Sequence, residues 1–442
     1  MLKKSVVILC GLLLAGCSVW RGFSGHTPSY EYAKGTVSEP LSVTGMTDYS
    51  QVDLGNAESF RVAMLLPLSG QMAGIGKSMK NAATMAIGDL NNNHLVIQFY
   101  DTKSNASGAR VAVENAINAG SSLILGPLLS DEVAAIAGES KSKDIPVISF
   151  STSPSILESG VYSLGLLNEE QINRIVRYAV SQGRRRLAAV LPDNQSGLNM
   201  FKSLMKVTRS AGMNLVKVGF YNPNSMDFTS LVTSMTAHSA QAEGGGKSFG
   251  FDALLIPESG NRLKAISSMF SYYDVAAPQV LFMGTSVWAN SNLSKETELY
   301  GAVYPVMSLN RLRNFEQKYV DLFGERPSGL DIFAYDAVAL ASALSHKDSR
   351  SLEEHILRMD GYYGMSGAFR IFADGRNEHG LDVVRITPDG EQVVEAAPSK
   401  FYTIQADYVQ GQTDISGSSY SNYYDMPQIY GKSAADLQNM LR

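Results

Sequence analysis

The sequence predicts an α/β protein made of two doubly wound lobes, each with a parallel sheet, joined by a hinge. Short apolar strand segments alternate with helical segments at the spacing of βαβ units. The alternation runs once, breaks before residue 161 and then starts again. The patterned region, residues 60–398, is about 340 residues long, which exceeds what one hydrophobic core usually encloses.

The first half opens with the strand 61–68, "RVAMLLPL", and a helix over 76–91. Continuous apolar runs such as "VAMLL" and "LIL" are typical of strands that are covered on both faces of a sheet. The other elements predicted in this half are the strands 94–101, 121–126 and 145–150 and the helices 108–119 and 130–143.

The second half opens with the strand 161–166 and the helical segment "NEEQINRIVRYAVSQG". Its other predicted elements are the strands 187–192, "NLVKVGFY", 251–257 and 279–284 and the helices 196–212 and 227–238. The turns "ADG" and "PDG", at 373–375 and 388–390, predict hairpins. Open α/β sheets bind ligands beyond the carboxyl ends of their strands, so we expect those ends to line a shared cleft.

The first sixteen residues predict a cleaved export signal. Lys3 and Lys4 precede an apolar stretch, Ser5 to Leu14, that is far shorter than the roughly 20 residues of a membrane-spanning helix. The following "LAGC" resembles the lipobox of bacterial lipoproteins. That resemblance implies cleavage before Cys17 and a lipid on Cys17. With a serine as the next residue, it also implies an anchor in the outer membrane.

The two ends of the chain show no sustained periodicity. Residues 17–59 are rich in Ser, Gly and Thr and predict a flexible tether behind the lipidated cysteine. Residues 399–442 predict a largely disordered tail. Cys10 would be removed with the signal, so the mature chain is expected to have no thiol, disulfide or cysteine metal site.

Charge and motif spacing exclude several function classes. The net charge of −5 becomes −7 when Lys3 and Lys4 are removed, which leaves no basic stripe for nucleic acid. In "GQMAGIGKS" five residues separate Gly70 from Gly76 where a phosphate-binding loop has four, and "EGGGKS" at 243–248 precedes no helix. The six histidines are scattered, and no nucleophile elbow occurs. We therefore expect no catalytic residue, metal or cofactor.

Several blocks of the sequence, in order, resemble type I periplasmic binding proteins of the leucine/isoleucine/valine receptor branch. They include "VAMLLPLSGQMAGIGKSMKNAATMAI", "LILGPLLSDEVAAIA", "LAAVLPDNQSGLNMFKSLMKVTRSAG", "FDALLIPESG", "AYDAVALASAL" and "GMSGAFRIFADG". The resemblance implies two lobes joined by three chain crossings that close on a small ligand. It places lobe 1 at about 60–164 and 306–360, and lobe 2 at about 165–305 and 361–398.

The resemblance also implies where a ligand would bind. Ser69 and Gly70 would lie at the rim of the cleft. Hydroxyls and helix N-terminal N–H groups would hold a ligand carboxylate. The candidates for this role are Ser130, as a helix N-cap, and Ser151, Thr152 and Ser153. The alternative is that these hydroxyls only cap helices.

On the ammonium side the sequence departs from the receptors. Ser286 stands where they carry an acid, Ser196 is the nearest match to an expected tyrosine, and Ile75 replaces an aromatic residue. Glu258 could supply the negative charge, or it could be an exposed loop carboxylate. A buried ammonium without an acceptor is costly. The sequence therefore predicts a half-dismantled amino-acid site.

Two functions stay open. The first is a regulatory module, since "LLPLSG", "GPLL" and the lipobox resemble outer-membrane lipoproteins that activate penicillin-binding proteins. Those activators carry a helical-repeat domain where this sequence has the tether 17–59. The second is a solute receptor that delivers a branched-chain-type amino acid or related small ligand to an ABC transporter permease.

Overall fold

The computed structural model describes residues 59–237, 240–241, 247–291, 293–345, 351–401 and 427–432. The predicted signal peptide, Cys17, nearly all of the tether and most of the predicted tail lie outside these residues. Among the helices in these ranges, none is both long enough and apolar enough to cross a bilayer.

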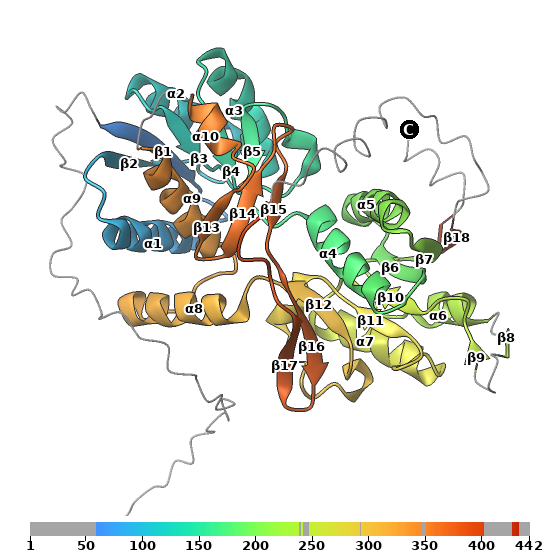
Figure 1. Ribbon diagram of the computed structural model, residues 1–442. Coiled ribbons are helices and arrows are strands. Elements are labelled where there is room, and N and C mark those ends of the chain that lie inside the picture. Colours follow the sequence, from blue (N-terminus) through green and yellow to red (C-terminus); the bar gives the residue numbers. More distant parts are fainter. Residues whose placement is uncertain are drawn as a thin grey trace, which may run out of the picture. The chain divides into compact units, whose positions relative to one another are not determined.

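The first lobe is built on a parallel sheet in the order β2-β1-β3-β4-β5, coloured blue to teal in Figure 1. Its strands are β1 (Phe60–Leu66), β2 (Leu95–Asp101), β3 (Leu123–Leu125), β4 (Val147–Ser149) and β5 (Val161–Ser163). The helices after the first three strands are α1 (Ala73–Leu90), α2 (Ala106–Asn118) and α3 (Ser130–Ser142). Strands β3 and β4 are buried throughout, as expected for a sheet covered on both faces.

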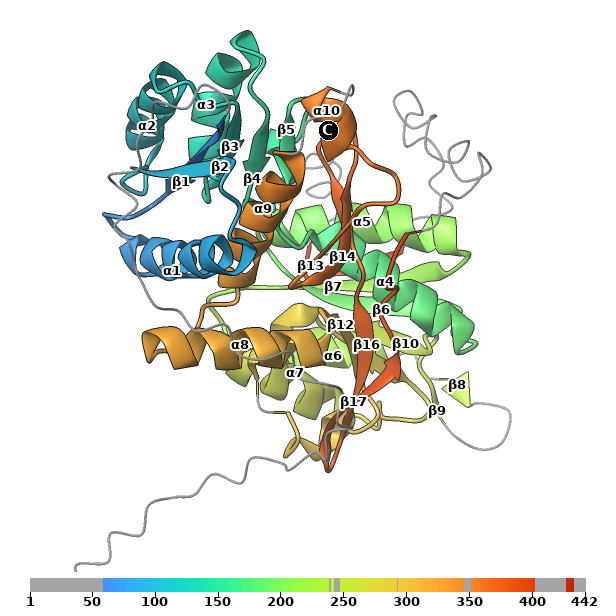
Figure 2. The same ribbon diagram turned by 60° about the vertical axis from the view of Figure 1, so that its left-hand side comes forward.

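A later part of the chain completes the first lobe. Helix α9 (Asp331–Leu344) packs along α1, as Figure 2 shows, and most of its residues are buried. Helices α8 (Leu309–Phe323) and α10 (Leu352–Ile356) contact α1 and α9 respectively. The core of this lobe therefore combines side chains from residues 60–164 with side chains from the segment after residue 306.

A small antiparallel sheet corrects the predicted lobe boundary. Its strands are β13 (Tyr362–Gly364), β14 (Gly367–Ile371) and β15 (Asn377–His379). The prediction placed 361–398 in lobe 2, but Phe369 and Ile371 belong to the hydrophobic core of the first lobe. The reason is that α9 offers them an apolar surface on the first lobe. After β12, the chain returns to the second sheet only at β16.

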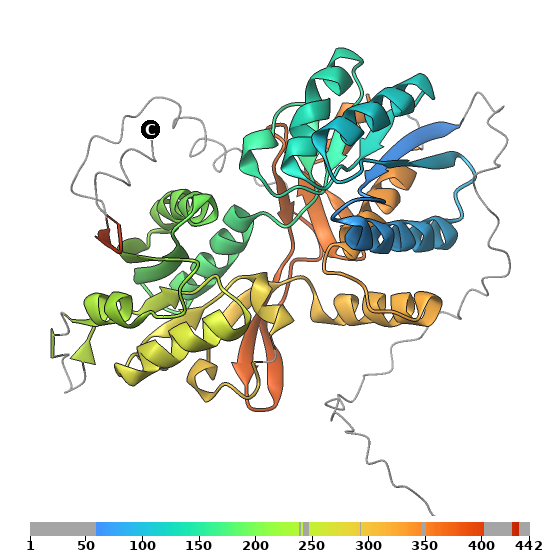
Figure 3. The same cartoon turned by 180° about the vertical axis from the view of Figure 1, so that it is seen from behind.

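The second lobe has an eight-stranded sheet in the order β17-β16-β12-β11-β10-β6-β7-β18, seen from behind in Figure 3. Strand β16 pairs antiparallel with both of its neighbours, β12 and β17, and all other pairs in the sheet are parallel. The strands are β6 (Arg186–Pro192), β7 (Asn214–Tyr221), β10 (Ala253–Leu255), β11 (Leu281–Met283), β12 (Val303–Val306), β16 (Asp382–Thr387), β17 (Gly390–Glu395) and β18 (Gln428–Tyr430). The helices are α4 (Asn168–Ser181), α5 (Gln195–Ala211), α6 (Thr229–Thr236) and α7 (Gly260–Tyr272).

Shorter elements complete the described chain. They are the pair β8 (Ala240–Gln241) and β9 (Lys247–Ser248) and the 3₁₀ turns η2 (Pro154–Ile156), η3 (Ser286–Asn290) and η4 (Thr297–Leu299). The turns at 373–375 and 388–390 join antiparallel strands, so the predicted hairpins are confirmed. Strand β18 lies in the segment predicted to be largely disordered, and its residues 428–430 pair with β7.

The glycine-rich stretch after β1 serves packing. Helix α1 begins at Ala73, three residues before its predicted start, so Gly76 lies in its first turn. A Cβ atom at Gly76 would stand 2.1 Å from the Pro67 carbonyl oxygen. Glycine therefore lets the start of the helix press against the end of the strand.

Candidate functional site

Both sheets contain the same topological switch point. In the first lobe β1 lies between β2 and β3, and in the second β6 lies between β7 and β10. At such a point the connections from adjacent strands leave on opposite faces of the sheet, and ligands bind beyond the strand ends there. The loops at these two points, with the helix starts that follow them, carry five of the predicted site residues: Ser69, Gly70, Ser130, Ser196 and Glu258.

The loop after β1 is bonded to the loop after β2. Ser69 donates to Asp101 from its backbone N–H at 3.0 Å and from its hydroxyl at 2.6 Å, and its carbonyl accepts from Ser104 at 2.7 Å. Burial raises the pKa of Asp101, but the donors around it outweigh burial and hold that pKa below its usual value. Gly70, at φ +82°, permits the approach, since a Cβ there would stand 2.7 Å from the Lys103 carbonyl oxygen. The Ser69 hydroxyl is thus used within the chain.

The N-terminus of α3 is closed by a carboxylate of the chain itself. Leu129 holds the N-cap position and Ser130 is the first helical residue, so the prediction of Ser130 as N-cap is wrong. Glu132 accepts the Leu129 N–H at 3.2 Å and the Thr102 hydroxyl at 2.6 Å. Burial raises the pKa of Glu132, while both donors act in the opposite direction. Glu132 therefore places a carboxylate of the chain itself at a helix N-terminus, the kind of position that also attracts an external anion.

Replacing Glu132 with alanine should lower the free energy of unfolding by about 2 kcal/mol. The change removes a helix cap and leaves the buried Thr102 hydroxyl without its acceptor. Glu132→Gln is the matched control, because its amide oxygen can still accept one of the two bonds, and we expect it to cost less. Urea denaturation measures both variants, and equal losses would contradict the role of these bonds.

The turn after β4 carries three predicted hydroxyls in different environments. The Ser151 hydroxyl is nearly buried and accepts the Ser153 N–H at 3.3 Å. The Ser153 hydroxyl shares a hydrogen bond with that of Ser155 at 2.9 Å. Thr152, between them, is exposed. Thr152 is therefore the predicted residue of this turn that is best placed to meet a ligand.

In the second lobe, Glu258 follows β10, the strand that lies beside β6 as β3 lies beside β1 in the first lobe. It accepts a hydrogen bond from the Tyr221 hydroxyl and pairs with Arg262, one helical turn later, at 3.5 Å. Arg262 also lies 5.6 Å from the centre of the Tyr221 ring and donates to the Pro223 carbonyl at 2.7 Å. Burial raises the pKa of Glu258, and Arg262 acts against that rise. Glu258 is thus neither an exposed loop carboxylate nor an unpaired charge.

The two remaining predicted residues of the second lobe, Ser286 and Ser196, have other surroundings. Ser286 begins η3 and donates its backbone N–H to the Gln171 side chain of α4 at 2.8 Å. Ser196 is exposed in the first turn of α5, where Asn194 is the N-cap. In the described part of the chain, neither residue is hydrogen-bonded to Glu258. The described hydrogen bonds therefore do not link these three residues to one another.

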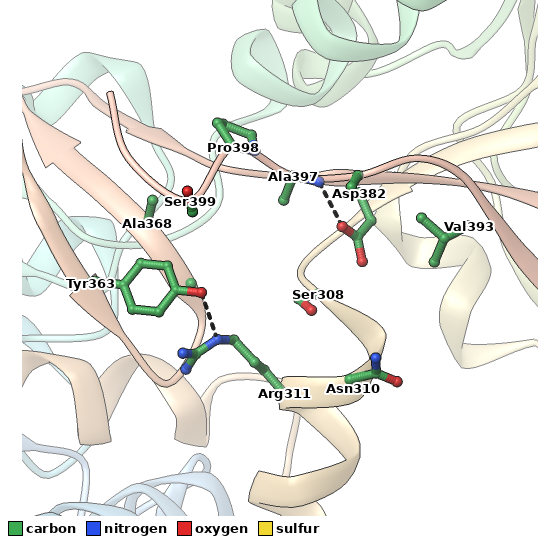
Figure 4. Close-up of a pocket in the computed structure, with 12 residues that line it drawn as sticks. Ser308, Asn310, Arg311, Tyr363, Ala368, Asp382, Val393, Ala397, Pro398 and Ser399 are labelled. Carbon is green, nitrogen blue, oxygen red and sulfur yellow. Dashed lines mark hydrogen bonds between the residues drawn. The ribbon is translucent and has the colours of Figure 1, made fainter. Parts of the chain in front are cut away.

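A cavity of about 310 Å³ lies where the chain crosses between the lobes near α8 and β16 (Figure 4). Arg311 lies 4.2 Å from the centre of the Tyr363 ring and donates to its hydroxyl at 3.2 Å. Asp382 accepts the backbone N–H groups of Leu309 at 3.3 Å and Ala397 at 2.7 Å. Arg311 and Asp382, the charged residues that line this cavity, are therefore hydrogen-bonded to other parts of the chain. Arg311 connects α8 to β13, and Asp382 connects the start of α8 to β16.

Sequence reasoning missed Asp101, Glu132 and Arg262. Glu132 had a usable signal, because an acid three residues after an N-cap position is half of a capping box. Arg262 also had one, since it follows Glu258 at the i,i+4 spacing of helical ion pairs. Asp101 had none, because its partner Ser69 is 32 residues away. In the described ranges, no group of three or more His, Cys, Asp or Glu side chains is arranged to hold a metal ion.

Solved structures share this fold at low sequence identity. The chain is similar to a putative branched-chain amino acid ABC transporter protein from Rhodospirillum rubrum, with 16% identity and a TM-score of 0.66 over 76% of this chain and 100% of that one. It is also similar to the substrate binding protein LivJ from Streptococcus pneumoniae, solved in complex with isoleucine. That match has 16% identity and a TM-score of 0.52 over 76% of this chain and 99% of that one.

One curated relative matches part of the chain. It is an uncharacterized protein of Rickettsia prowazekii (strain Madrid E), 24% identical over 167 residues, which make up 38% of this chain and 44% of the relative. The chain thus spans less than half the length of that relative. A family model described as "Periplasmic binding protein" matches residues 59–392, well over half of the chain. The chain therefore belongs to the periplasmic binding protein family, with the two-lobed type I fold of the leucine- and branched-chain-amino-acid-binding proteins.

Proposed function

We propose that this protein is a non-catalytic, lipid-anchored module of the periplasm that regulates penicillin-binding proteins in peptidoglycan synthesis by contact with them. The family supports the periplasmic location. The lipobox-like "LAGC" with Cys17, followed by Ser18, supports an anchor in the outer membrane. The resemblance of "LLPLSG" and "GPLL" to the activator lipoproteins supports this class of partner.

One observation carries the proposal: an acid in each half of the expected amino-acid site is bonded to the chain itself. Glu132 accepts the N-cap N–H of the helix at which a ligand carboxylate is expected to bind, and it also accepts the Thr102 hydroxyl. Glu258, the acid best placed to receive an ammonium, is already paired with Arg262 and Tyr221. A family fold whose ligand-binding positions are satisfied internally is better suited to protein contact than to carrying free amino acids.

Charge at the start of α3 adds an energetic argument. A ligand carboxylate about 5 Å from an ionised Glu132 would be repelled by roughly 3 kcal/mol at an effective dielectric constant of about 20. Asp131 adds a second acid in the same helical turn. Repulsion of 3 kcal/mol corresponds to a loss of about two orders of magnitude in affinity.

A thermal-shift screen tests the claim about free amino acids. The chain from residue 18 onward is melted with single amino acids, short peptides and muropeptides. A ligand at 100 times its Kd adds about 2.7 kcal/mol, which raises the melting temperature clearly. We expect no shift with any free amino acid. A clear shift with one of them, abolished by Thr152→Ala, would overturn the proposal.

Direct binding tests the partner class. We expect immobilised full-length protein to bind purified penicillin-binding synthases in biolayer interferometry and to raise their rate of glycan polymerisation. Thr152→Ala serves as the matched control and should leave both readouts unchanged. If no synthase in a panel binds or responds, the proposed partner class is wrong.

The second candidate, a solute receptor for an ABC transporter, is favoured by a different observation. The fold aligns over most of the chain with LivJ, a substrate binding protein solved with isoleucine. Thr152 also remains exposed in the turn after β4. The same thermal-shift screen separates the two candidates, because only the receptor should be stabilised by a branched-chain-type amino acid.

A further inference from the structure

A segment from the C-terminal end of the chain adds the last strand to the second sheet. Gln428–Tyr430 form β18, which pairs in parallel with Lys217–Gly219 of β7 (Figures 1 and 3). The described chain before β18 ends at residue 401, so about 25 residues of intervening sequence separate the two. Strand β18 is thus contributed by a part of the chain that is distant in sequence from both β7 and β17.

The side chains of this segment complete both faces of the sheet. Ile429 packs against the core that includes α4 and α5, and Tyr430 packs against the core that includes α6 and α7. Lys432 forms an ion pair with Asp193 and lies 5.9 Å from the centre of the Phe220 ring. An aliphatic residue, an aromatic residue and a cation therefore each have a defined place beside β7.

Glycine at position 431 is required by the backbone. Gly431 has φ +77°, and a Cβ atom there would stand 2.0 Å from the Phe220 carbonyl oxygen. A residue with a side chain would be strained at that φ and would collide with the backbone of β7. Glycine is thus required at this position of a segment that docks on the edge of β7.

The contact is small compared with the core it covers. Only three residues of β18 pair with β7, a strand that runs over eight residues, Asn214–Tyr221. Elements with few buried contacts open at lower free energy than the core does. When β18 leaves, β7 presents the unpaired N–H and C=O groups of an edge strand, which an extended peptide can pair with.

We infer that the edge of β7 is a docking site for an extended peptide of a partner protein, and that residues 428–432 act as an internal competitor for that site. The partner segment would run parallel to β7 and carry an aliphatic residue, an aromatic residue, glycine and a basic residue in succession. The ion pair of Lys432 places the docked segment against Asp193, next to the loop at the switch point of the second lobe. This inference goes beyond the proposed function, since it concerns a different surface and does not depend on the strand-end loops.

The experiment uses the full chain with Gly431→Val, which should undock the segment without removing it. A fluorescein-labelled peptide of the sequence 425–434, "DMPQIYGKSA", is titrated with each protein and followed by fluorescence anisotropy. If the internal segment is docked for about 90% of the time, the wild type should bind this peptide about tenfold more weakly than the variant. A peptide carrying the same Gly→Val change should bind neither protein.

Two further measurements make the result decisive. Hydrogen exchange should show that those amides of Lys217–Gly219 that face β18 lose protection in G431V and regain it with the peptide, while the amides of β1 stay protected and show that the variant is folded. If G431V binds the peptide no better than the wild type, the inference is wrong. If the wild type is a dimer by light scattering and G431V is a monomer, the segment is exchanged between copies, and internal competition is wrong.

Discussion

Replacing Trp288 with alanine should lower the free energy of unfolding by about 4 kcal/mol, the range expected when a buried aromatic side chain is deleted. Trp288 is fully buried and donates its indole N–H to the Ile256 carbonyl at 2.9 Å. Its ring centroid lies 5.8 Å from that of Tyr304. A Cβ atom at position 284 would stand 2.1 Å from the indole, so this space exists only because Gly284 has no side chain. The alanine variant leaves a cavity that close-packed neighbours cannot fill.

Denaturant titration followed by far-UV circular dichroism measures the effect. Trp288→Phe is the matched control, because it keeps most of the apolar volume and loses the hydrogen bond to Ile256, and we expect it to cost about half as much. The loop that holds Ser286 against Gln171 lies next to this tryptophan, so the alanine variant should also loosen that contact. A loss below about 1 kcal/mol would contradict the packing role assigned to Trp288.

The second large effect is expected at the chain crossing near β15. Replacing Glu170 with alanine should cost about 3 kcal/mol, because a buried, hydrogen-bonded carboxylate would be removed from its partner. Glu170, on α4, accepts the backbone N–H of His379 and lies 3.4 Å from its ring nitrogen Nδ1. The His379 ring in turn packs against Phe333 and Phe369 of the first lobe. The pair therefore fastens α4 of the second lobe to the core of the first.

Comparison with Glu170→Gln gives the pH dependence of this contact. Burial raises the pKa of Glu170, while the contacts from His379 act against the rise and Glu378 adds to it. The folded state therefore keeps this proton at pH values where the unfolded state, with a pKa near 4.5, has lost it. The wild type should consequently lose stability relative to E170Q as pH rises from the unfolded pKa through the folded one, and the difference should be constant above it.

Urea denaturation of the wild type, E170Q and E170A between pH 4 and pH 8 tests both statements. We expect E170Q to remain close to the wild type at low pH and E170A to be less stable throughout. A difference between wild type and E170Q that is independent of pH would show that Glu170 titrates alike in the folded and unfolded states. A stability of E170A equal to that of E170Q would show that the bond to His379 contributes nothing.

The strands and helices that were predicted between residues 61 and 284 could be predicted because they have local signals. Apolar strands such as "VAMLL" and amphipathic helices such as α4 and α5 show their periods within a few residues. The placement of β13 to β15 could not be predicted this way, since which lobe they cover depends on the apolar surface of α9. The same holds for β18, whose three residues carry no signal of pairing with a strand more than 200 residues earlier in the sequence.

For the candidate site too, features with a local sequence signal could be predicted and contacts between distant residues could not. The sequence by itself determined the two doubly wound lobes, the family and the positions of the strand-end loops, because hydrophobic period and the order of motifs are written along the chain. Only the tertiary structure decided what those loops contact. Glu132 meets Thr102 across 30 residues, Tyr221 meets Glu258 across 37, and His379 meets Glu170 across 209. A hydrogen bond between residues so far apart forms only when the folded sheets bring them together, so local sequence patterns carry no record of it.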